Sequence, residues 1–121
     1  MALEKLLLYD EAIESYKRVI WEFERISDEE KEDRWDLEAT FNLARLYEVM
    51  NKKTSAYTLW KKIFEEETIF SVKCDALRRM MWTCEDEKNF AELQKLLAIY
   101  DNLKTDEFAD DIENIRNNLE V

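Results

Sequence analysis

The chain of 121 residues contains no glycine and no proline. Glycine supplies the positive φ angles that tight turns need, and proline fixes the backbone at the start of many turns. Average proteins contain about 7% glycine and about 5% proline, so the absence of both restricts the connections that this chain can form. The sequence therefore predicts helices joined by short polar turns. It also excludes the glycine-rich loops that hold phosphates in the common nucleotide-binding folds.

The composition favours one all-α domain over residues 1–121. Hydrophobic residues make up 46% of the chain and charged residues 39%, a balance that is typical of amphipathic helices. A chain of this length can bury a core of helices without disulfides or metal. Apolar residues recur at steps of three and four along most of the chain, and no segment shows the alternation of a strand.

The formal net charge of −11 opposes binding to nucleic acid, because affinity for phosphates comes mainly from lysine and arginine. No apolar run reaches the roughly 18 residues that suggest a membrane span. The first ten residues, MALEKLLLYD, lack the basic and then apolar layout of a secretory signal. We therefore expect a cytoplasmic protein that binds neither nucleic acid nor membrane.

Few residues could carry chemistry. The chain has no histidine, and its two cysteines, Cys74 and Cys84, are separated by about 15 Å of rise if one helix carries both. We expect them to be reduced, buried and unpaired. The acidic runs at 28–33 and 106–113 are interpreted as solvated faces, since calcium loops require a glycine. The sequence predicts no metal, no cofactor and no enzymatic activity.

The apolar periodicity predicts about six helices. The first covers 1–26, with Leu6, Tyr9, Ile13, Tyr16, Ile20 and Phe23 along one face. Ser27 and Glu30 fit a capping box for the second helix, which ends at Asn51 as a left-handed stop. A third helix follows the polar break NKKTS, a fourth begins near Ser71, and a fifth begins near Phe90. Thr105 is expected to cap the last helix.

One segment resembles a known repeat. The stretch TFNLARLYEVMNKKTSAYTLWKKIF places large, small and aromatic residues as a tetratricopeptide repeat does, at Leu43, Ala44, Tyr47, Ala56 and Trp60. The resemblance implies a short right-handed α-solenoid of antiparallel helical hairpins. Residues 28–67 form the best-matching repeat, 1–26 are the helix of a partial first repeat, 70–101 form a degenerate repeat, and 105–121 form a C-terminal capping helix. Asn51 and Lys88 stand where the family has glycine at the hairpin turn.

The resemblance also implies a concave groove for a partner. The family's groove-facing positions correspond here to Glu38, Phe41, Asn42, Arg45, Glu48 and Val49, and in the degenerate repeat to Asp75, Arg78, Arg79 and Trp82. The residues expected to bind the partner are Phe41, Asn42, Arg45, Glu48, Arg78 and Trp82. The arginines suit carboxylates, and the aromatic rings suit an apolar anchor. Alternatively, the arginines pair with carboxylates of this chain, such as Glu38, Glu48 or Asp75.

The expected function is a non-catalytic protein–protein interaction module, a scaffold, adaptor or co-chaperone-like domain that binds a peptide segment or a partner helix in its groove. The family's clamp for heat-shock-protein tails is not reproduced, so that ligand is not expected. Two alternatives stay open. One is an acidic decoy that sequesters a basic protein, and the other is a self-association domain that forms homo-oligomers.

Overall fold

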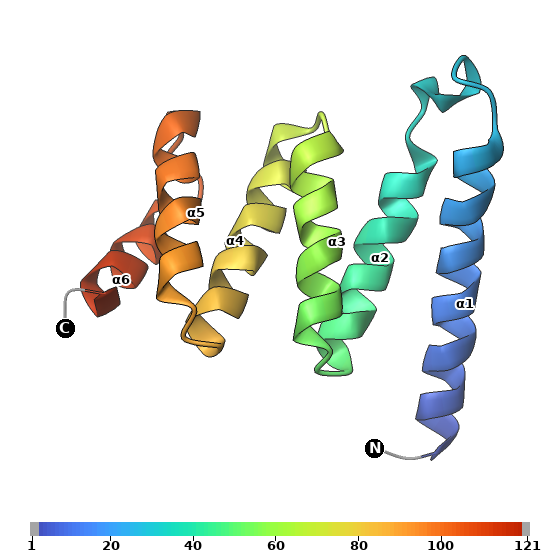
Figure 1. Ribbon diagram of the computed structural model, residues 1–121, viewed down its shortest axis with the longest axis horizontal. Helices are drawn as coiled ribbons and strands as arrows, with labels where there is room; N and C mark the ends of the chain where they lie inside the picture. The colour runs from blue at the N-terminus through green and yellow to red at the C-terminus, as the bar shows by residue number, and fades with distance from the viewer. Residues whose placement is uncertain (1–2, 120–121) are drawn as a thin grey trace. The chain divides into compact units, whose positions relative to one another are not determined.

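The computed structural model describes residues 3–119. Its elements are α1 (Leu3–Arg25), a 3-10 turn η1 (Glu30–Glu32), α2 (Trp35–Val49), α3 (Lys53–Glu66), α4 (Phe70–Asp86), α5 (Phe90–Leu103) and α6 (Ala109–Leu119). The described part of the chain contains no strand. The predicted all-α class with six helices is therefore confirmed (Figure 1).

The chain forms two compact units, residues 1–63 and residues 64–121. The first unit holds α1, η1, α2 and most of α3, and the second holds the end of α3 and the last three helices. The boundary thus falls inside α3.

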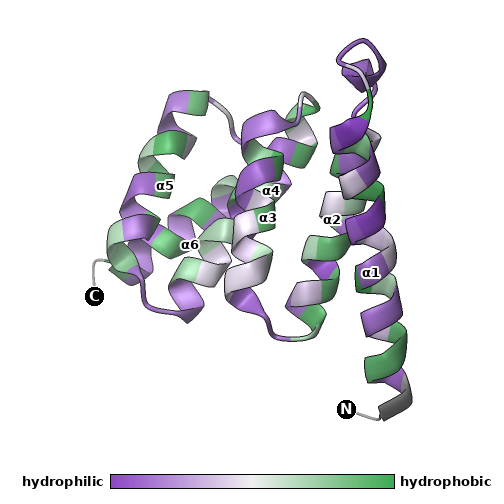
Figure 2. Cartoon of the chain, turned by 45° about the vertical axis from the view of Figure 1, so that its right-hand side comes forward, coloured by the Kyte–Doolittle hydropathy of each residue, from purple (hydrophilic) through white to green (hydrophobic). Residues whose placement is uncertain are grey.

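In the first unit, α1 and α2 lie side by side and run in opposite directions (Figure 1). Helix α1 alternates hydrophobic and hydrophilic residues along its length, as an amphipathic helix does (Figure 2). Its predicted apolar face is buried best at Ile13, in the middle of the helix, and at Phe23, near its C-terminal end. The small residues Ala44 and Ala56 are fully buried, which permits close approach of neighbouring helices.

The predicted capping box at Ser27 is wrong. Helix α2 begins eight positions later, at Trp35, and the carbonyl of Ser27 instead accepts a hydrogen bond from the backbone of Glu30 at 3.0 Å. The segment 28–33 contains no apolar residue, so a helix there would have no face to bury. Trp35 packs edge-on against Phe23, with ring centroids 4.9 Å apart, and this contact fixes where the second helix starts.

The turn between α2 and α3 agrees with the sequence. Asn51 has φ 59°, so the predicted left-handed stop is confirmed. The backbone N–H of Lys52 donates to the carbonyl of Tyr47 at 2.8 Å, which satisfies one of the last carbonyls of α2. Asparagine takes this conformation more easily than most residues other than glycine.

In the second unit, α4 and α5 are joined by the short polar turn that the sequence predicts. Lys88 has φ 57°, and the backbone N–H of Asn89 donates to the carbonyl of Cys84 at 2.9 Å. The side chain of Asn89 then caps α5 by accepting from the backbone of Glu92 at 3.4 Å. Cys74 and Cys84 are both buried and form no disulfide, as expected.

The predicted cap at Thr105 is also wrong. Its hydroxyl accepts from the backbone of Glu107 at 3.1 Å, but α6 begins only at Ala109. The hydroxyl of Tyr100 donates to the Glu107 carbonyl at 2.7 Å, and the ring of Tyr100 lies 5.1 Å from that of Phe108. These contacts hold the segment in a turn in which Phe108 has φ 43°.

Candidate binding surfaces

Helix α2 carries four of the six residues that the sequence places in the groove. Phe41, Asn42 and Glu48 are half-buried, and Arg45 is exposed. Their spacing of three and four residues puts them on neighbouring turns of one helix. Val49 extends this face at the end of the helix and is 61% exposed. We call this set of five residues the α2 face.

Phe41 is partly a core residue. Its ring packs edge-on against the buried Trp60 of α3, with centroids 5.0 Å apart and planes at 86°. An edge-to-face pair of this kind holds the ring in place. Phe41 is therefore held against the core, while the exposed apolar part of the α2 face is Val49.

Arg45 differs from Arg34, Arg78 and Arg79, each of which pairs with a carboxylate of this chain. It makes no ion pair or side-chain hydrogen bond within the described residues 3–119, although the chain carries 29 acidic residues. A guanidinium that no carboxylate of its own chain holds can present its full set of donors to a partner. Among the arginines expected in the groove, Arg45 is the one whose guanidinium is not held by a carboxylate in residues 3–119.

Arg78 of α4 is already held within the second unit. Its Nη2 atom lies 2.5 Å from Oδ2 of Asp111 in α6, and its guanidinium carbon lies 4.6 Å from the centre of the Trp82 ring. The sequence suggested pairing with a nearby carboxylate, but it could not identify one 33 positions away. The neighbouring Arg79 pairs with Asp75 one turn earlier, at 3.2 Å.

Trp82 lies one turn after Arg78 and is 40% exposed. The cation over its ring is an attractive contact that orders the indole on the surface. Within the second unit, the fold thus brings Arg78 and Trp82 into direct contact. The indole keeps an exposed part, while the charge of Arg78 is shared with Asp111.

A hollow of about 610 Å³ opens beside Arg78. Five carboxylates line it, from Asp75, Asp106, Glu107, Asp110 and Asp111, together with Ser71, Cys74, Phe108 and Ala109. Burial raises the pKa of the Cys74 thiol, and the charge of Glu107 raises it further. The thiol is therefore protonated at neutral pH and is a poor nucleophile.

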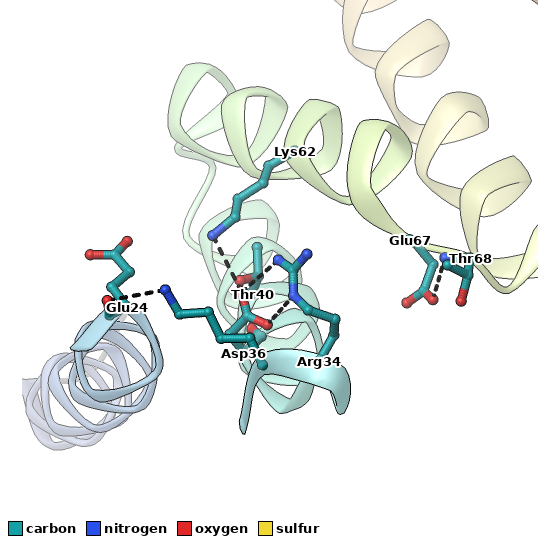
Figure 3. A network of polar contacts seen from close by, with 8 residues as sticks. Glu24, Arg34, Asp36, Thr40, Lys62, Glu67 and Thr68 are labelled. Carbon is teal, nitrogen blue, oxygen red and sulfur yellow. Dashed lines mark hydrogen bonds and ion pairs between the residues drawn. The ribbon is translucent and has the colours of Figure 1, made fainter. Parts of the chain in front are cut away.

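Sequence reasoning missed a buried charge in the first unit. Asp36 is 2% exposed, and Arg34 donates two hydrogen bonds to its carboxylate at 2.8 and 2.9 Å. Lys62 of α3 adds an ion pair at 3.7 Å, and both cations point toward Asp36 (Figure 3). The hydroxyl of Thr40 donates to the backbone carbonyl of Asp36 at 2.7 Å. The available signal in the sequence was that Arg34 and Asp36, which have opposite charges, are two residues apart. The burial of Asp36 could not be predicted from this spacing.

Burial alone would raise the pKa of Asp36. The hydrogen bonds and charge of Arg34, with the charge of Lys62, outweigh this effect and lower the pKa below its usual value. Asp36 is therefore ionised at neutral pH and joins α2 to α3. All of its partners come from the chain itself, so this cluster is structural.

No group of three or more histidine, cysteine or acidic side chains in the described residues has an arrangement that could hold a metal ion. Among the same residues, no helix combines the length and the apolar character needed to cross a membrane. No protein-family model matches the chain, and no curated protein or solved structure matches it either.

Proposed function

We propose that this chain is a non-catalytic module that binds an acidic peptide segment or partner helix, and that the α2 face makes the main contact. The observation that carries the proposal is Arg45, an exposed guanidinium without an ion pair in residues 3–119. The chain has a net charge of −11, so an arginine without an ion pair is a distinct positive site on its surface. Next to the apolar side chains of the α2 face, this guanidinium favours a carboxylate of a partner. Phe41 and Val49 supply the apolar contact beside it.

The resemblance to tetratricopeptide repeats is part of this proposal. It is supported by the buried small residues Ala44 and Ala56 and by the positive φ angles of Asn51 and Lys88 at the two hairpin turns. A right-handed solenoid of such hairpins would present the first helix of each repeat, here α2 and α4, to a partner. The absence of histidine from the sequence fits a function without catalysis.

In this proposal, α4 binds a partner differently from α2. Because Asp111 neutralises much of the charge of Arg78, we assign Arg78 the role of ordering Trp82 rather than that of binding a carboxylate. The exposed part of Trp82 then serves as an apolar contact for a partner. This assignment replaces the expectation that Arg45 and Arg78 both bind carboxylates of the partner.

The proposal is tested with a library of peptides displayed against the immobilised protein. We expect enrichment of sequences that combine aspartate or glutamate with one large apolar residue. Arg45→Glu should weaken binding of a selected peptide at least about tenfold, because it replaces attraction by repulsion at a desolvated contact. Lys61→Glu is the matched control, since it makes the same charge change at an exposed position of α3.

Two results would contradict the proposal. One is equal loss of affinity in Arg45→Glu and Lys61→Glu, which would indicate an effect of net charge alone. The other is enrichment of basic peptides whose binding falls steeply with salt, which would favour the acidic decoy instead. Circular dichroism of both variants confirms that they remain folded.

A further inference from the structure

The outward face of α1 exposes two large apolar side chains at either end of a row of charged residues. Leu7 is 55% exposed and Trp21 is 53% exposed, and the two residues border the same shallow hollow along the helix. Both lie roughly opposite the buried Phe23 on the helix. Large apolar side chains that stay exposed together commonly mark an interaction surface.

Trp21 is held in a fixed position before any partner arrives. The guanidinium of Arg25 lies 3.4 Å from the centre of its ring, and the Nη1 atom of Arg25 donates to the carbonyl of Trp21 at 3.2 Å. An ordered side chain loses less conformational entropy when it becomes buried at an interface. One face of the indole is covered by Arg25, and much of the ring stays exposed.

On either side of the central Glu14, the charges between Leu7 and Trp21 form two blocks of opposite sign. Asp10 and Glu11 stand in the first half, and Lys17 and Arg18 stand in the second. All four are exposed, and none makes an ion pair in the part of the chain that the structure describes. If a second copy of this helix lies antiparallel to the first, the acidic block of each copy lies beside the basic block of the other.

We propose that α1 pairs with α1 of a second copy of this chain in an antiparallel arrangement around a two-fold axis at Glu14. Leu7 and Trp21 stand seven residues before and after Glu14, so each would meet the other in the partner. Such an isologous contact uses the same patch on both copies and closes as a dimer.

The same axis matches the charges. Glu11 and Arg18 occupy nearly the same angular position on the helix, and so do Asp10 and Lys17, because residues seven apart fall close to two full turns. Their midpoints lie within about half a residue of Glu14. In the dimer, Glu11 therefore faces Arg18 and Asp10 faces Lys17, which gives four ion pairs.

The contact is short and the dimer is weak. From Leu7 to Trp21 the helix rises by about 21 Å, which is less than the span of a standard interface. The net charge of −11 on each copy also opposes association over long distances. We therefore expect a dissociation constant on the order of 10 to 100 µM and tighter association at moderate salt than at very low salt.

The decisive experiment uses two charge-reversed variants and sedimentation velocity over a concentration series. The first variant is Asp10→Lys with Glu11→Lys, and the second is Lys17→Glu with Arg18→Glu. Each variant alone should dimerise at least about tenfold more weakly than the wild type, because all four ion pairs become repulsive. An equimolar mixture should dimerise again, since every pair across the mixed interface is once more of opposite sign.

A wild-type chain that stays monomeric up to its solubility limit would overturn the proposal. So would a wild type that dimerises while the two variants dimerise equally well, because the interface would then lie elsewhere. The restored association of the mixture cannot be explained by misfolding of either variant. Circular dichroism of each variant alone provides the matching control.

The position of the axis has its own test. Glu14 would face Glu14 of the second copy, so Glu14→Gln removes a repulsion and should tighten the dimer by about two- to fivefold. Glu24→Gln is the matched control, because Glu24 is exposed on the same helix and lies outside the proposed contact. Equal tightening by both variants would place the axis elsewhere and contradict the arrangement.

Discussion

Replacement of Arg34 by alanine removes both hydrogen bonds to the buried carboxylate of Asp36. In the folded protein that carboxylate is 2% exposed and would keep only Lys62 as a charged partner, at 3.7 Å. A buried charge that loses a partner is strongly destabilising, because water cannot replace the missing donor. Arg34→Ala should therefore destabilise the first unit although Arg34 itself is only half-buried.

The size of the effect follows from these contacts. Breaking a buried ion pair costs about 3–5 kcal/mol when no other partner remains. Lys62 stays near the carboxylate, so we expect a loss of about 2–3 kcal/mol in the free energy of unfolding at pH 7. With a urea slope of about 2 kcal/mol per M, the unfolding midpoint should fall by about 1–1.5 M.

The pH dependence gives an independent check. The folded-state pKa of Asp36 is lowered, so its ionised form stabilises the wild type above the unfolded pKa of about 3.9. This contribution is lost as the pH falls through the folded pKa. In Arg34→Ala, the charge of Arg34 no longer offsets the effect of burial, so the pKa of Asp36 rises. Lowering the pH then protonates Asp36 and removes the buried charge that destabilises the variant. The difference in stability between wild type and Arg34→Ala should therefore narrow as the pH falls toward 4.

Urea unfolding followed by circular dichroism at pH 7 and at several lower pH values measures both effects. Arg45→Ala is the matched control, because Arg45 is exposed on α2, the helix that Arg34 precedes, and has no ion pair in residues 3–119. It should change the free energy of unfolding by less than about 0.5 kcal/mol. An equal loss in the free energy of unfolding for Arg34→Ala and Arg45→Ala would contradict this prediction. So would a loss for Arg34→Ala that stays constant with pH.

Two further predictions concern the second unit. Cys74 and Cys84 are buried, and burial raises the pKa of Cys74, so a maleimide should label neither thiol in native buffer and both in denaturant; rapid native labelling would contradict this packing. Lys88→Gly should raise the free energy of unfolding by about 0.5–1 kcal/mol in a urea titration, because Lys88 has φ 57°, whereas Lys88→Ala should bring no such gain.

Much of the helical pattern was predictable from local chemistry. Apolar periodicity located all six helices, and the polar residues Asn51 and Lys88 marked the two hairpin turns, where both have positive φ angles. These features depend on residues close in sequence, so a linear reading captures them. The burial of Cys74 and Cys84, and their lack of a disulfide, followed from the same periodicity.

The two errors in helix starts share one cause. Ser27 and Thr105 carry side chains that often cap helices, but in both places a ring contact decides where the helix begins. Trp35 packs against Phe23, and Phe108 packs against Tyr100, so the backbone stays in a turn until the ring is in place. A cap stabilises a helix by about 1 kcal/mol, and an aromatic pair contributes about 0.5–1.5 kcal/mol beyond its buried area, so the two effects are of similar size.

The sequence by itself determined the class of this protein: helices joined by polar turns, with a formal net charge of −11. Tertiary structure alone decided which charges are available. Arg78 is held by Asp111 and Asp36 is buried between Arg34 and Lys62, while Arg45 remains exposed. Helix formation depends on neighbours three and four residues away, whereas the state of a charge depends on whichever residue the fold brings within about 4 Å.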